Sequence, residues 1–139
     1  MNPALAMALL LPLVSAAAAA EQHHAIEECE ALSQAGMRIC LTRKAAESQA
    51  LLKRAEGESS AVLSRWDENA RYAKLAKERL DASSNAFERY REAQCAFMAS
   101  LGGGAITGAL DVRRLACISR LDEERATSLA NSVAALPRR

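Results

Sequence analysis

The chain has 139 residues, of which half are apolar, 4% are aromatic and 25% are charged. Its 18 basic and 17 acidic residues leave a net charge of +1 and are interleaved along the chain, which argues against a nucleic-acid partner because no basic patch with neighbouring aromatic residues forms. The length suits one domain with a modest core, and because alanine is the commonest apolar residue, that core must come from close helix packing.

The first 20 residues predict a cleaved signal peptide. They form an apolar run that ends in Ala18-Ala19-Ala20, directly before the polar Glu21. The run is too short and too rich in alanine for a good transmembrane helix, but its start lacks Lys and Arg, so an uncleaved anchor remains the alternative. We expect residues 21–139 to act as a single domain in the periplasm or outside the cell, without stable membrane insertion.

A short first helix is predicted by the first two cysteines. On one unbroken helix, Cys29 and Cys40 would be about 16 Å apart, whereas a disulfide needs Cα atoms within about 7 Å. If they pair, the chain must turn between them, and Gly36 is suited to the position just after a helix. We therefore expect a short helix over residues 25–34, folded back on a helix that begins near Met37.

The long central stretch, residues 37–101, predicts helices with one interruption. It contains no proline and only one glycine, and it is rich in Ala, Glu, Arg, Lys and Leu. A single helix of this length would span nearly 100 Å at about 1.5 Å per residue, too long for a compact domain. We place the break at residues 66–69, where Asp67 and Asn69 are candidate N-caps, with residues 83–85 as the competing position.

Two apolar stripes predict the remaining helices, on either side of a glycine-rich reversal at residues 102–108. The first stripe consists of Phe87, Tyr90, Gln94, Phe97, Met98 and Leu101. The second consists of Leu110, Cys117, Ile118, Leu121, Arg125 and Leu129. The predicted fold is therefore all-α, a disulfide-bonded bundle or hairpin of three main helices plus a short N-terminal helix.

The last two cysteines, Cys95 and Cys117, lie on opposite sides of the glycine reversal and could join two antiparallel helices. In an oxidising compartment all four cysteines are expected in disulfides. Four cysteines permit three pairings, and spacing alone does not choose among them. Local pairing, Cys29 with Cys40 and Cys95 with Cys117, is the arrangement that helix geometry favours.

No catalytic or metal-binding pattern stands out. His23 and His24 lie near Glu27, Glu28, Cys29 and Cys40, all ligand types for zinc. The chain lacks the tightly spaced ligand pairs of structural zinc sites, and it has no motif that presents a serine to a histidine base. We therefore expect no metal, no cofactor and no enzymatic activity.

Two arginines occur on predominantly apolar helix faces. Arg91 follows Tyr90, and Arg125 is in register with the second stripe. Because an isolated buried charge is costly, each arginine needs a partner. One interpretation is an internal ion pair or a side chain whose charged end reaches solvent. The other is a groove near Tyr90, Arg91 and Arg125 that binds a small ligand or serves an envelope-stress response.

Residues 87–95, Cys117 and residues 121–129 together resemble the N-terminal domain of the lysozyme inhibitor LprI family, and Cys29 and Cys40 match its first cysteine pair. The resemblance implies a helical, disulfide-bonded, exported protein that acts by binding another protein, with lysozyme as the named partner. In that case the segment small enough to enter a sugar-binding cleft is the loop of residues 100–108, where the hydroxyl groups of Ser100 and Thr107 could form hydrogen bonds.

Overall fold

The computed structural model describes residues 25–139, so the predicted signal peptide and the two histidines lie outside the described residues. Every regular element in this part of the chain is a helix: α1 (Ala25–Cys29), α2 (Gln34–Ser64), α3 (Ala70–Ser100) and α4 (Thr107–Ala134). This confirms the predicted all-α fold with three main helices and a short N-terminal helix.

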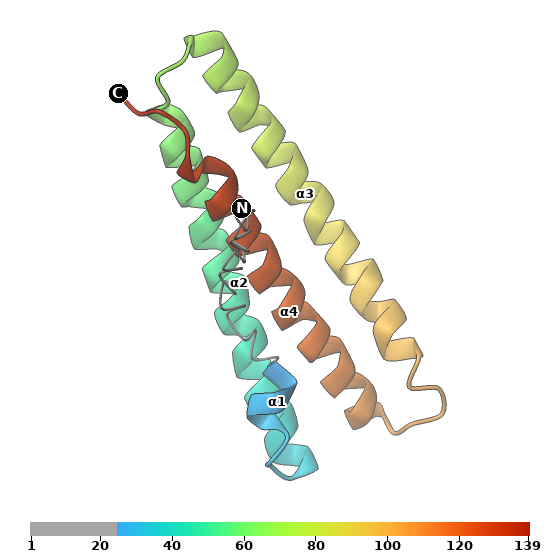
Figure 1. The fold of residues 1–139 in the computed structure, drawn as a ribbon. Helices are drawn as coiled ribbons and strands as arrows, with labels where there is room; N and C mark the ends of the chain where they lie inside the picture. Colours follow the sequence, from blue (N-terminus) through green and yellow to red (C-terminus); the bar gives the residue numbers. More distant parts are fainter. Residues whose placement is uncertain (1–24) are drawn as a thin grey trace, which may run out of the picture.

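The three long helices lie side by side (Figure 1). Helices α2 and α3 have 31 residues and α4 has 28, so each is about 40 to 47 Å long at 1.5 Å per residue. The chain reverses after α2 and again after α3, which leaves α2 and α4 parallel to each other and α3 antiparallel to both. Helix α4 packs against α2 along much of its length and also supports α3.

The seam between α2 and α4 is built from small and medium side chains at alternating spacings of three and four residues, the pattern of coiled-coil packing. On α2 the buried positions include Leu41, Ala45, Ser48, Leu52, Ala55, Ser59 and Val62. On α4 they include Val112, Ser119, Asp122, Ala126 and Leu129. Because alanine and serine are frequent, the two helix backbones can approach closely, as the composition predicted.

The reversal between α1 and α2 differs from the prediction. Helix α1 ends at Cys29, and the next helix begins at Gln34 with Ser33 as its N-cap, whose Oγ accepts a hydrogen bond from the backbone N–H of Gly36 at 3.3 Å. Gly36 therefore lies in the first turn of α2 and does not follow the first helix. A serine able to cap a helix start determines this boundary, because it satisfies a backbone donor that otherwise has no partner.

The break between α2 and α3 lies where it was predicted. Asn69 is the N-cap of α3, and its Oδ1 accepts a hydrogen bond from the backbone N–H of Arg71 at 2.9 Å. Asp67 has a different role, because its backbone N–H donates to the carbonyl of Pro137 at 2.9 Å. The competing break at residues 83–85 is wrong, since α3 continues through this stretch.

The C-terminal residues close the end of the bundle that holds this break. The backbone N–H of Arg139 donates to the carbonyl of Arg65 at 2.9 Å, and Arg138 forms an isolated antiparallel bridge with Trp66. The Arg139 guanidinium also lies 3.4 Å from the Asp67 carboxylate. The chain end and the α2–α3 turn thus hold each other in place.

The first predicted stripe is only partly buried. Tyr90, Phe97 and Leu101 are exposed, at 53%, 55% and 58%. Helix α3 instead buries Arg91 and Cys95. The helix is therefore rotated from the predicted face, because the disulfide of Cys95 and the ion pair of Arg91 both draw their side of the helix toward α4.

The second predicted stripe is correct. Four of its residues are buried on α4: Cys117, Ile118, Leu121 and Leu129. Leu110 and Arg125 are half-buried. This face of α4 is in contact with α2 and α3 at once, so it requires more apolar surface than α3 does.

Both disulfides have the local pairing. Cys29 joins Cys40 with a Cα–Cα distance of 5.9 Å, and Cys95 joins Cys117 with a distance of 5.5 Å. The first ties α1 to α2 and packs with Leu41, and the second ties α3 to α4 near their connecting loop. The two bridges therefore fasten the same end of the bundle, opposite the end closed by the C-terminal residues.

The α3–α4 loop depends on one glycine conformation. Gly103 has a φ of 57°, in the left-handed region, which costs other residues about 1 kcal/mol or more. A Cβ atom on the neighbouring Gly104 would meet no atom within 4 Å.

We expect Gly103→Ala to lower the free energy of unfolding by about 1 kcal/mol, and Gly104→Ala to leave it unchanged or raise it slightly. Urea denaturation of both variants tests this, and equal effects would contradict it.

Candidate functional site

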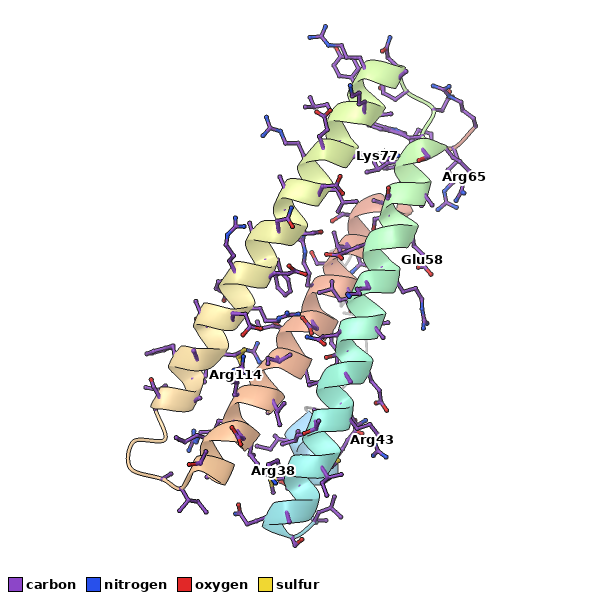
Figure 2. All side chains as sticks on the ribbon, turned by 180° about the vertical axis from the view of Figure 1, so that it is seen from behind. Arg38, Arg43, Glu58, Arg65, Lys77 and Arg114 are labelled. Atoms are coloured by element: carbon purple, nitrogen blue, oxygen red, sulfur yellow. A yellow bond between two sulfur atoms is a disulfide. The ribbon has the colours of Figure 1, made fainter. Side chains whose placement is uncertain are left out.

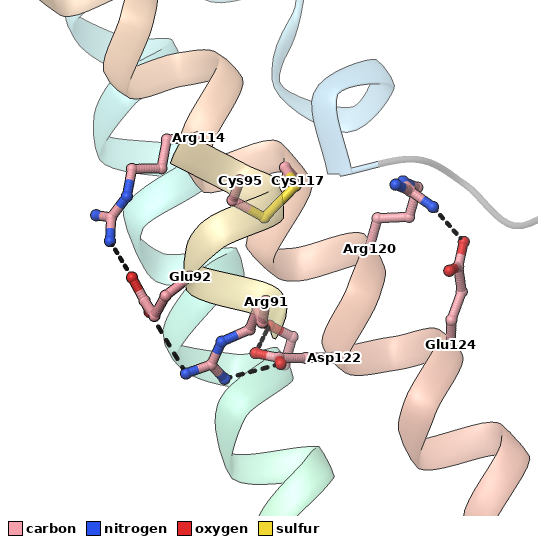
Figure 3. Close-up of a disulfide and its surroundings, with 9 residues drawn as sticks. Arg91, Glu92, Cys95, Arg114, Cys117, Arg120, Asp122 and Glu124 are labelled. Atoms are coloured by element: carbon pink, nitrogen blue, oxygen red, sulfur yellow. Dashed lines mark hydrogen bonds and ion pairs between the residues drawn. A yellow bond between two sulfur atoms is a disulfide. The ribbon is translucent and has the colours of Figure 1, made fainter. Parts of the chain in front are cut away.

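A fully buried aspartate lies at the centre of the bundle. The side chain of Asp122 on α4 has no exposed surface, and Arg91 on α3 is only 8% exposed. Arg91 Nη1 donates a hydrogen bond to Asp122 Oδ1 at 2.9 Å (Figure 3). The pair joins α3 to α4 by a charge-assisted hydrogen bond, one of the stronger polar contacts in proteins.

The third helix reaches the pair through Ser48 of α2. Ser48 Oγ lies 3.4 Å from Asp122 Oδ2 and 2.9 Å from the carbonyl oxygen of Ala45. A hydroxyl group has one hydrogen, so it cannot donate fully to both oxygens. Because Ser48 Oγ lies closer to the Ala45 carbonyl oxygen, its hydrogen bond to Asp122 Oδ2 is the weaker of the two.

The pair continues outward to the protein surface through Glu92. Glu92 Oε1 lies 3.6 Å from Arg91 Nη2, and its Oε2 accepts a hydrogen bond from Arg114 Nη2 at 2.5 Å. Figure 3 shows this row of alternating charges, which runs from the exposed Arg114 to the buried Asp122. A change at the surface arginine can therefore affect the charges that surround the core pair.

Burial raises the pKa of Asp122 above its ordinary value of 3.8, because the low-polarity interior disfavours the charged carboxylate. The hydrogen bond and the charge of Arg91 act in the opposite direction, as does the Ser48 hydroxyl, and Glu56 adds to the increase. Arg91 Nε has no hydrogen-bond partner among the described residues. The pair therefore recovers only part of the cost of removing its charges from water.

The three residues predicted to share a groove have different surroundings. Arg91 is engaged in the buried ion pair, the structural one of the two interpretations, whereas the neighbouring Tyr90 is exposed. Arg125 Nη2 donates to Ser83 Oγ at 2.6 Å, and its guanidinium carbon lies 5.7 Å from the centre of the Phe87 ring. The fold thus uses Arg91 and Arg125 to hold α3 against α4, while the Tyr90 ring lies 6.4 Å from the Phe87 ring, centre to centre.

The predicted loop lies at the disulfide-bonded end. Ser100 Oγ donates a hydrogen bond to the carbonyl of Phe97 at 2.6 Å, so its hydrogen is already used, and Thr107 is exposed at the start of α4. Six large apolar residues with exposed surface belong to this end of the bundle: Ile26, Leu32, Ile39, Phe97, Leu101 and Ile106. We call these six residues the apolar tip.

Among the described residues, which do not include His23 and His24, no group of three or more His, Cys, Asp or Glu residues is placed to hold an ion. Cys29 and Cys40 are joined to each other, and Glu28 forms an ion pair with Lys44. None of the described helices is both long and apolar enough to cross a membrane.

The family described as lysozyme inhibitor LprI matches residues 26–129. The chain belongs to the LprI family. The matched range holds all four cysteines and the Arg91–Asp122 pair of this LprI protein, whereas the closing residues 137–139 lie beyond it. No curated protein and no solved structure matches the chain significantly. Membership and the two disulfides agree with an exported protein.

Sequence reasoning missed Asp122 as the partner of Arg91, and Ser48 as a second contact of Asp122. The sequence did contain a signal for such a partner, because Asp122 shares the buried face of α4 with Ser119 and Ala126. A charged residue on a buried helix face predicts a partner on a facing helix. Which helix supplies that partner depends on the rotation of α3, and this rotation follows from tertiary contacts.

The buried pair predicts an asymmetry between single and double substitutions in this LprI protein. Asp122→Ala leaves the Arg91 charge buried without its partner and should lower the free energy of unfolding by about 3 to 5 kcal/mol. Replacing both residues, with Arg91→Met and Asp122→Leu together, should leave stability within about 1 kcal/mol of the wild type or raise it. Chemical denaturation measures both, and a double variant as unstable as the single one would contradict the argument.

The raised pKa of Asp122 predicts a pH dependence. Between the ordinary value of 3.8 and the higher folded value, the folded protein holds a proton that the unfolded chain has released. The contribution of Asp122 to stability therefore falls as pH rises through this range. The stability of the wild type minus that of Asp122→Asn should decrease from acid toward neutral pH. Denaturation of both proteins across this range tests it, and a difference that increases with pH would contradict it.

Proposed function

We propose that this chain is an exported, non-enzymatic protein that binds and inhibits lysozyme. The observation that carries the proposal is the family match over residues 26–129, since that family is described by its lysozyme inhibitors. The two buried disulfides support the compartment, because such bridges form and persist outside the reducing cytosol. We further propose that cleavage after Ala20 releases residues 21–139 as one domain into the periplasm or the medium.

We assign the contact with lysozyme to the apolar tip. Leu101 and Ile106 flank the α3–α4 loop and are 58% and 73% exposed, which is costly for a surface that stays in water. The Cys95–Cys117 bridge restrains the two helices that carry this loop. A restrained loop loses little conformational entropy on binding, so more of the contact energy becomes affinity.

The chemistry of the loop suits a cleft. Aliphatic side chains can fill apolar subsites, and burying one fully contributes about 1.5 to 3 kcal/mol. The exposed hydroxyl group of Thr107 can exchange hydrogen bonds with groups that normally bind sugar, and Ser100 Oγ can accept one in addition to the bond that it donates. The loop would thus occupy the cleft and exclude substrate without any reaction.

Electrostatic attraction contributes little in this proposal. Acidic and basic residues are interleaved and the net charge is +1, so the chain presents no acidic face to a basic enzyme. Association should therefore have an ordinary rate that depends weakly on salt, with affinity determined by the apolar contact.

The test is a titration of the mature protein against lysozyme together with a cell-wall lysis assay. We expect Leu101→Ser with Ile106→Ser to weaken both binding and inhibition by about tenfold or more, since tenfold corresponds to 1.4 kcal/mol. Leu75→Ser is the matched control, because Leu75 is 45% exposed near the opposite end of α3. No binding by the wild type at tens of micromolar would remove lysozyme as the partner. Equal losses in tip and control variants would refute the assignment to the tip.

A further inference from the structure

A second surface feature lies beside the apolar tip, on the face where α2 and α4 meet. It is a cavity of about 630 Å³, within the usual range of ligand pockets. Three arginines line it, Arg38 and Arg43 from α2 and Arg114 from α4, and Figure 2 shows all three toward the same end of the bundle. Asp111 is the only acidic residue in its described lining, so three guanidinium groups and one carboxylate group line the cavity, with Glu47 and Glu92 beside two of the arginines outside the lining.

Two of these arginines keep hydrogen-bond donors available. The guanidinium of Arg38 lies 4.0 Å from the Asp111 carboxylate, and that of Arg43 lies 3.8 Å from the Glu47 carboxylate. Both separations exceed the distance of about 2.7 to 2.9 Å typical of a charge-assisted hydrogen bond. Each guanidinium has five N–H donors, so these loose ion pairs leave most of them for another acceptor.

Arg114 has a closer acidic partner than Arg38 and Arg43 have. It donates to Glu92 at 2.5 Å, which orients its guanidinium beside the cavity wall. An anion that binds at Arg114 must share it with Glu92. Binding in the cavity is therefore coupled to the row of charges that ends at Asp122.

The cavity also has an apolar part. Ile39 is 70% exposed and lines it beside the half-buried Leu115. An inorganic anion would make no use of these side chains. Arg38 and Arg43 are also separated by about 7 to 8 Å along α2, at 1.5 Å per residue, so one small anion cannot bridge both readily. A ligand that used the whole cavity would carry several carboxylates on an aliphatic frame.

We propose that this cavity binds a short acidic peptide segment, with its carboxylates on Arg38, Arg43 and Arg114 and an aliphatic side chain against Ile39 and Leu115. Carboxylates match the planar fork of the arginine guanidinium, and the peptide's small side chains match the apolar wall. Its described lining residues include no aromatic side chain for stacking, which disfavours a single-stranded nucleic acid. The site shares Ile39 with the apolar tip, but its described lining includes no residue of the loop 100–108, and the proposal does not depend on the assignment to lysozyme.

The experiment is calorimetric titration of the folded protein with the tetrapeptide Ala-Glu-Ala-Glu bearing an acetylated N-terminus and a free C-terminus. Its uncharged counterpart is Ala-Gln-Ala-Gln with an acetylated N-terminus and an amidated C-terminus. We expect the acidic peptide to bind at low salt and the uncharged one to bind at least tenfold more weakly. Arg38→Gln and Arg114→Gln should each weaken the acidic peptide about tenfold, because each removes a charge-assisted hydrogen bond.

Arg113→Gln is the matched control, since it makes the same change in charge at the residue of α4 that precedes Arg114, outside the cavity lining. This variant should bind the acidic peptide with an affinity within about twofold of the wild-type value. Glu92→Gln should tighten binding severalfold, because it removes the negative charge that competes for Arg114. Circular dichroism confirms that each variant is folded, and Arg38→Gln does not touch the buried pair.

The proposal is overturned if the uncharged peptide binds as well as the acidic one, or if Arg113→Gln weakens binding as much as Arg38→Gln does. It is also overturned if inorganic phosphate binds as tightly as the peptide, since that would show a surface with general affinity for anions. Lysozyme inhibition is measured on the same variants. The arginine variants should lose peptide binding and keep inhibition, whereas the tip variants should lose inhibition and keep peptide binding. The two measurements therefore separate a failure of this site from a failure of the proposed function.

Discussion

The buried contact between Arg91 and Asp122 is the constraint on which the rest of this structure depends. Helix α3 buries only two residues, Arg91 and Cys95, and each is bonded to α4, one by an ion pair and the other by a disulfide. They are four residues apart and so occupy one face of the helix. Together they determine both the rotation and the position of α3 along α4.

That rotation has a consequence for the surface. Because the polar and sulfur contacts turn their own face of α3 inward, Tyr90 and Phe97 are turned outward. Apolar contacts alone would favour burying these rings. The exposure of these two rings therefore follows from the way the core is bonded, and Phe97 adds to the apolar tip because α3 is held by two specific bonds.

The two ends of the bundle are closed by different kinds of interaction. Covalent bridges restrain the end that carries the apolar tip and the arginine-lined cavity, whereas hydrogen bonds between residues 65–67 and 137–139 close the other end. Disulfides limit the separation of helices more strictly than surface hydrogen bonds do. The end with the two proposed binding features is thus the more constrained one, which reduces the entropy lost when a partner binds.

The sequence by itself determined the helical class and the buried face of α4, and it favoured the break before Asn69 and the local disulfide pairing. Helix-favouring composition, a capping side chain and the limited reach of a disulfide are short-range effects that can be evaluated from neighbouring residues. The family, too, was indicated by the cysteine and arginine pattern, and with it the proposed partner. Only the tertiary structure decided which face of α3 is buried, that Asp122 is the partner of Arg91, and that Arg38, Arg43 and Arg114 line one cavity. These depend on how two or three helices rotate against one another, and residues more than 20 positions apart in the chain carry no local signal of that rotation.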